Sequence, residues 1–256
     1  MIKFFRRIRQ QLLTDLPAGK AGNRISKYLL YAIGEIVLVV IGILIALQFN
    51  QMREDRIDRE KELAYLKEIH LDFVSNKFQL DSLIRHNSRA LHSCNRLHLL
   101  IAEIKSEGLP EKFQEHPMSD SLIYYQRLSF SNMSFNPRNG SVRALINSSS
   151  FDLIQNDSLR RCLISWQDVL DDYLEEEQFA MDFLFNEYSP YQLNNYNYED
   201  FFCTENIQTW FDIREYNFRM KRRGDLGNML TTVESEGIVD MIDDIIRYTK
   251  FETGND

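Results

Sequence analysis

The chain is poor in residues that interrupt helices and in residues that cross-link a fold: its 256 residues include 10 Gly, 5 Pro and 3 Cys. The strict apolar-polar alternation that indicates a half-buried strand is nearly absent. Neither Gly nor Pro occurs from Gln51 to Glu107, where apolar residues recur at helical spacing until Gly108 and Pro110 end the pattern. These features predict an all-α fold.

The apolar positions of this segment form one stripe, made of Leu63, Leu66, Ile69, Phe73, Leu80, Leu83, Ile84, Leu91, Cys94, Leu97, Ile101 and Ile104. The stripe is wider than the seam of a two-stranded coiled coil, which favours burial in an antiparallel helical bundle. We expect further helices at 119–128, at 141–187 with a break at 147–150, and at 207–251. Asn156 or Asp157 caps the restart after the break, and the Tyr- and Asn-rich stretch 187–202 is expected to be a loop.

The sequence also lacks the short motifs of the common catalytic sites. It contains no G-x-S-x-G, no glycine-rich phosphate loop, no C-x-x-C and no H-E-x-x-H. Cys94 and His98 are spaced to hold half of a zinc site, but His70, His86 and His92 fall on other helix faces and supply no second half. We therefore expect no metal, no cofactor and no catalytic residue, and we predict that the protein is not an enzyme.

The three cysteines, Cys94, Cys162 and Cys203, lie far apart in the chain. In an oxidising compartment at most one pair of them forms a disulfide, and the sequence does not identify that pair. Three reduced and buried thiols are the default expectation.

One long apolar run dominates the N-terminal part. Residues 28–49 hold only Glu35 and Gln48 as strongly polar members. A helix of this length is about 33 Å long, enough to cross a hydrocarbon core of about 30 Å. The run predicts a single transmembrane helix, which divides the chain into a tail at 1–27, the span at 28–49 and a domain at 50–256.

Basic residues around the span indicate its orientation. Seven Lys and Arg residues precede it with only Asp15 opposing them, whereas the basic residues at 53–59 alternate with acids. The positive-inside rule therefore places the N-terminus in the cytoplasm and the domain at 50–256 across the membrane. A cleaved signal peptide is the alternative, but the basic region and the apolar run are too long and no A-x-A site follows. We expect an uncleaved signal anchor.

The first residues, MIKFFRRIRQQLL, interleave apolar and basic side chains and predict a short amphipathic helix on the anionic inner leaflet. Pro17, Gly19 and Gly22 form a joint before the span. Anchoring is the expected role of this helix, and docking of a cytoplasmic partner is the alternative.

Charge excludes one class of partner. Residues 50–256 carry 23 basic and 36 acidic residues, a net charge of −13. A nucleic-acid-binding protein needs a basic face, so we expect no nucleic-acid partner.

The opening MIKFFRRIRQQLL, followed by YAIGEIVLVVIGILIALQFN, resembles the N-terminal signature of a bacterial family of unknown function, whose members are small, singly anchored membrane proteins. The later stretch ALINSSSFDLIQNDSLRRCLISW resembles a central segment of that family. After Phe49 the chain carries NQMRED, where a tryptophan-bearing run is usual. The resemblance implies a membrane-tethered helical domain and no particular activity. In a bacterium, the predicted orientation places the span in the inner membrane and the C-terminal domain in the periplasm.

Glu35 is the one acid within the predicted span. Three interpretations stay open: the side chain snorkels toward the cytoplasmic interface, it contacts a partner helix, or it lies on a proton or ion pathway. Gly42 and Ala46 favour the second, because they form a small-x-x-x-small pair on roughly the face of Glu35 and permit close helix packing.

Two further groups of side chains are candidate contact sites. The aromatic stretch offers a recognition loop at Tyr188, Tyr191, Tyr196, Tyr198 and Phe201, unless these rings instead close the end of the bundle. An acidic ridge, made of Asp168, Asp171, Asp172, Glu175 and Glu176, is typical of a solvated helix face, with a divalent-cation site as the alternative.

Together these observations predict a membrane-tethered helical interaction or sensory-type module. Its expected partners are the lipid bilayer and either a second copy of itself or another membrane protein. The cytoplasmic tail is too short for an output enzyme, so a signal would pass through a partner or through the oligomeric state. The alternative function is an accessory subunit of an ion-driven membrane complex that uses Glu35. An extracytoplasmic enzyme is a third and weaker hypothesis.

Overall fold

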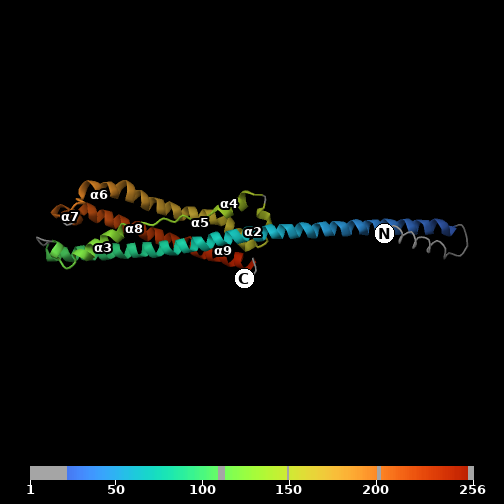
Figure 1. Cartoon of the computed structure of the whole chain (residues 1–256), viewed down its shortest axis with the longest axis horizontal. Coiled ribbons are helices and arrows are strands. Elements are labelled where there is room, and N and C mark those ends of the chain that lie inside the picture. Colours follow the sequence, from blue (N-terminus) through green and yellow to red (C-terminus); the bar gives the residue numbers. More distant parts are fainter. Residues whose placement is uncertain (1–21, 109–112, 149, 201–202, 253–256) are drawn as a thin grey trace. The chain divides into compact units, whose positions relative to one another are not determined.

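The computed structural model describes residues 22–108, 113–148, 150–200 and 203–252 (Figure 1), and the described residues contain helices and no strand. The elements are α2 (Gly22–Glu107), η1 (Phe113–Glu115), α3 (Ser119–Ser129), α4 (Gly140–Asn147), η2 (Phe151–Leu153), α5 (Asp157–Asp182), η3 (Phe183–Tyr188), α6 (Ser189–Asn195), α7 (Thr204–Trp210), α8 (Ile213–Ser235) and α9 (Ile238–Glu252). The all-α prediction is confirmed for these ranges. The chain divides into two compact units, Met1–Arg59 and Glu60–Asp256.

The first unit contains the predicted span, and all its described residues are helical. Every side chain from 31 to 57 is exposed, so no protein covers the apolar segment within one copy. This helix is long and apolar enough to cross a membrane. The predicted amphipathic helix in the N-terminal tail, MIKFFRRIRQQLL, lies outside the described residues.

The larger core of the second unit is shared by α2, α5, α8 and α9, which lie side by side in Figure 1. Phe73 of α2 and Trp166 of α5 meet edge to face at its centre, with ring centroids 4.9 Å apart. The buried stripe of α2 recurs every three or four residues, as the sequence predicts, and it meets matching stripes on the other helices. These stripes hold the unit together.

Polar contacts establish the directions of two neighbours of α2. The Glu62 carboxylate accepts from the backbone N–H of Gln155 at 2.7 Å, and Phe73 contacts Trp166, so α5 runs in the same direction as α2. Both contacts join residues whose numbers differ by 93, so residue n of α5 lies at the same height along the helix axis as residue n − 93 of α2. Lys77 pairs with Asp243, and two turns earlier His70 meets Thr249, so α9 runs in the opposite direction.

A second apolar cluster closes the other part of this unit. It gathers the last turns of α2 with η1, α3, η3, α6 and α7, and its largest side chain, Trp210, is buried. Phe113 packs edge to face on Trp210, with ring centroids 6.0 Å apart. The aromatic stretch of the sequence contributes to this cluster.

Helix ends follow from local chemistry. The Asn156 side chain accepts from the backbone N–H groups of Ser158 and Leu159 and so caps α5. Gly108 (φ +87°) follows the end of α2, and Gly237 (φ +63°) makes the turn between α8 and α9, a backbone region that favours glycine.

The expected loop at 187–202 is wrong for its first half. A π-helical turn at Phe183–Tyr188 continues α5 and leads directly into α6, which has Pro190 in its first turn, where a missing N–H costs little. The helix propensity of this stretch is low, so the sequence alone does not indicate a helix here. The burial of Tyr188 and Tyr191 stabilises the helix instead.

Candidate functional site

The three residues proposed for helix contacts in the membrane, Glu35, Gly42 and Ala46, are exposed in a single copy. A Cβ atom built on Gly42 meets nothing within 4 Å. The described residues provide no ion-pair partner for Glu35. The helix face formed by Glu35, Gly42 and Ala46 is therefore open to lipid or to another helix.

The aromatic residues proposed for recognition separate into two groups. Tyr188, Tyr191 and Tyr196 are buried in the second core cluster, whereas Tyr198 is 60% exposed. Phe201 lies outside the described residues. Tyr188, Tyr191 and Tyr196 therefore do not form the exposed recognition loop that we expected. They pack in the core at the end of the second unit instead.

Tyr188 and Tyr196 lie beside a buried polar network centred on Glu215 of α8. The Glu215 side chain is 0% exposed, and its Oε1 accepts from Gln126 Nε2 at 2.8 Å and from the Tyr188 hydroxyl at 3.0 Å. Gln126 Nε2 also donates to the Tyr188 oxygen at 2.8 Å, which joins α3, η3 and α8. Arg219 Nη1 lies 3.8 Å from the same carboxylate oxygen.

Two buried arginines of α8 donate to backbone carbonyls. Arg219 Nη1 donates to the carbonyl of Trp210 at 3.0 Å. Arg222 donates through Nε to the carbonyl of Ser129 at 3.1 Å and through Nη2 to the carbonyl of Ser131 at 2.7 Å. Because the last carbonyls of a helix lack partners within that helix, Arg222 stabilises the C-terminal end of α3.

Burial controls the protonation of this network. Desolvation raises the pKa of Glu215, and the positive charge of Arg219 with the bonds from Gln126 and Tyr188 offsets only part of the rise. Desolvation and the nearby Glu215 charge also raise the pKa of Tyr188 and of Tyr196, so both phenols stay neutral. The network is suited to joining helices and to responding to protons. It offers no activated nucleophile.

A second buried carboxylate, Glu177 of α5, accepts from the backbone N–H of Phe135 with both oxygens at 3.1 Å. Desolvation raises its pKa, and this N–H bond opposes the rise. Glu177 thereby fixes the extended segment between α3 and α4 against α5.

The sequence interpretation missed Glu215, Arg219 and Arg222, although a signal was present. These charged residues follow at i, i+4 and i+7, and the same stripe of α8 continues with the buried Leu226, Met229 and Val233. Charged residues in register with an apolar stripe indicate buried charges, because one helix face packs on the core along its whole length.

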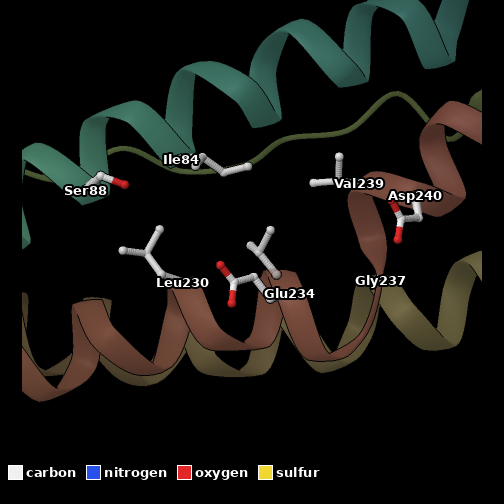
Figure 2. A pocket seen from close by; sticks show the side chains of 8 residues that line it. Ile84, Ser88, Leu230, Glu234, Gly237, Val239 and Asp240 are labelled. Carbon is white, nitrogen blue, oxygen red and sulfur yellow. The ribbon is translucent and has the colours of Figure 1, made fainter.

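A pocket of about 500 Å³ lies where α8 turns into α9 beside α2 (Figure 2). Ile84 and Ser88 contribute from α2, Leu230 and Glu234 from α8, and Asp240 with Val239 from α9. The two carboxylates have no histidine or cysteine beside them in the lining. Across the described residues, no group of three or more His, Cys, Asp and Glu side chains is placed to hold a metal ion.

Comparison with known families identifies a family for most of the chain. A model of a family of unknown function (DUF6090) matches residues 35–197, which extend from Glu35 in α2 to the end of α6 and beyond it by two residues. The match does not include the N-terminal signature before Glu35. No curated protein and no solved structure matches the chain.

Proposed function

Because this chain belongs to that family of unknown function, we propose its function from its own residues: a membrane-tethered helical module that acts through protein contacts. In this proposal α2 crosses the bacterial inner membrane once, with the N-terminus in the cytoplasm and the second unit in the periplasm as an antiparallel helical bundle. The module senses or assembles, and it does not catalyse a reaction.

The observation that carries the proposal is the exposure of the apolar part of α2. Its side chains are exposed from residue 31 to residue 57, although Tyr31–Phe49 is almost free of charge. A soluble protein rarely leaves so long an apolar surface uncovered, and lipid is the cover that its length fits. The excess of basic residues before the span supports the cytoplasmic N-terminus.

The second unit supports a contact role because its buried charges are engaged in joining helices. Glu215 and Arg222 each hold α8 to α3, while Glu177 holds α5 to the segment before α4. A change in the protonation or packing of these groups would alter the surface that a partner meets. No observation in the described residues favours the alternative of an ion-driven complex.

The proposal includes self-association through the span. Gly42 and Ala46 provide a small-residue face, and Glu35 lies seven residues before Gly42 on a similar side of the helix. In hydrocarbon, a hydrogen bond from a partner helix would stabilise the carboxyl group of Glu35.

Cross-linking of the full chain in membranes tests this arrangement. Gly42→Leu should lower cross-linking through the span several-fold, because the added side chain keeps the helices apart. Val40→Leu, on the opposite helix face, is the matched control and should have no effect. Glu35→Gln should preserve both insertion and cross-linking. If Gly42→Leu cross-links as well as the parent chain, association through this face is wrong.

A further inference from the structure

The solvent face of α2 in the second unit carries a stripe of positive charge. Residues 82–102 contain no Asp or Glu, and Arg85, Arg89, His92 and Arg96 are all exposed. Their spacing of i, i+4, i+7 and i+11 places them on one side of the helix, opposite the buried stripe. We call these four residues the basic stripe.

The solvent face of α5 carries the opposite charge. From residue 162 to residue 213 the chain has no Lys or Arg, although it contains twelve acids. Asp168, Asp171, Glu175 and Asp182 are exposed and follow at i, i+3, i+7 and i+14, again on the side opposite the core. We call these four residues the acidic stripe.

The two stripes do not neutralise each other within one copy. Each lies opposite the core face of its helix, and the core faces of α2 and α5 meet at Phe73 and Trp166. Among the described residues, no ion pair involves either stripe. Arg85 donates to Ser82, Asp171 accepts from Gln167 and Asp182 accepts from Gln178, all of them neutral partners on the same helix. Both stripes therefore leave unpaired charge on the surface.

Exposed apolar side chains accompany both stripes. Phe78 and Leu99 flank the basic stripe and are 73% and 56% exposed, while Ile164 and Phe179 lie along the acidic stripe and are each 58% exposed. Surfaces with large apolar side chains beside charges of one sign are typical of protein contacts.

The two stripes overlap in height over part of their length. Because residue n of α5 is level with residue n − 93 of α2, Glu175 and Asp182 are level with residues 82 and 89 of α2. They thus bracket the height of Arg85 and Arg89. Two copies anchored in the same membrane with the same orientation would bring these charges together without a vertical shift.

We propose that the occupant of the basic stripe is a second copy of this chain, which presents its acidic stripe. This inference rests on the proposed membrane tether, which keeps neighbouring copies parallel and at high local concentration. The contact is heterologous, since the two surfaces differ, so a pair of copies keeps one free stripe of each sign, the acidic stripe on one copy and the basic stripe on the other, for further neighbours. Repetition gives rows of copies in the plane of the membrane.

Charge-reversal variants of the full chain in lipid vesicles test the contact, with energy transfer between dye-labelled copies as the readout. Arg85→Glu with Arg89→Glu should weaken association about tenfold, and Glu175→Lys with Asp182→Lys should weaken it similarly. A mixture of the two double variants should recover association, because each reversed stripe then meets a complementary one. Arg143→Glu, which changes an exposed arginine of α4, is the matched control and should leave association unchanged.

Salt gives an independent readout. Raising the ionic strength from about 0.01 M to about 0.15 M shortens the Debye length from about 30 Å to about 8 Å, so association of the parent chain should weaken. Neither double variant alone should show that dependence. Failure of the reversals to weaken association, or of the mixture to recover it, would overturn the inference. The membrane tether is judged separately, by whether the chain sediments with the vesicles.

Discussion

At the scale of single residues, the clearest feature is a carboxylate with no exposure to water. Glu215 keeps two hydrogen-bond donors and one arginine close to Oε1, yet desolvation remains the largest influence on its pKa and raises it. Buried ionisable groups of this kind couple protons to conformation, because the folded and unfolded chains bind protons with different affinity.

Glu215→Gln should change how stability depends on pH. The pKa of Glu215 in the folded chain lies above its ordinary value of 4.5, so the unfolded chain loses this proton first as the pH rises. The contribution of Glu215 to stability is therefore fully present below pH 4.5 and is lost as the pH passes through the folded pKa. Urea unfolding across this range should show the parent chain losing stability relative to the variant.

Glu199→Gln, which changes an exposed acid, is the control and should leave the pH profile unchanged. Parallel profiles for the parent chain and Glu215→Gln would show that the carboxyl group has the same pKa in the folded and unfolded chains, and would contradict the assignment.

Only part of this residue-level description could be predicted from the sequence. The apolar stripe of α2 identifies its buried positions, and Leu66, Ile69 and Phe73 lie in the core. The burial of Tyr188 could not be predicted, because Tyr is common both in cores and at recognition surfaces. The partners of Glu215 come from α3, η3 and α8, and a single sequence does not show which residues of distant elements meet.

At the scale of elements, α8 organises the second unit. Its buried face combines apolar residues with Arg219 and Arg222, which bond to carbonyls of Trp210 in α7 and of Ser129 and Ser131 at the end of α3. These bonds add polar contacts between α8 and segments that also supply Leu122 and Trp210 to the second apolar cluster.

Arg222→Met should destabilise the second unit by about 3 kcal/mol, because two carbonyls lose a charged donor while the apolar stem is largely retained. The neighbouring Arg223 is exposed, so Arg223→Met should change the free energy of unfolding by less than about 0.5 kcal/mol. Chemical denaturation of the full chain in detergent, followed by circular dichroism, measures both. Equal effects of the two substitutions would show that the contacts of Arg222 contribute nothing.

Elements defined by local chemistry were predictable, whereas those that depend on packing were not. Gly108 ends α2 and Asn156 caps α5, both through local backbone or side-chain geometry. The helix at Ser189–Asn195 follows a π-helical turn and contains Asn and Pro, which local propensity does not favour. It forms where aromatic rings are buried against α7 and α8.

At the scale of the whole molecule, the chain combines an uncovered apolar helix with a compact unit that has its own core. The sequence predicts both features, because a long uncharged run and a regular apolar stripe are unambiguous in composition and period. It does not identify the partner, since recognition depends on which exposed faces meet in space.

The most direct test of the account is the topology of the full chain in a bacterial cell. Two reporters fused separately to the C-terminus distinguish the outcomes: an enzyme that is active only after export, and a fluorescent protein that folds only in the cytoplasm. The account predicts an active exported enzyme, a dark fluorescent protein and a chain that stays with the membrane until detergent is added. A fluorescent C-terminal fusion, or a chain that is soluble without detergent, would contradict it.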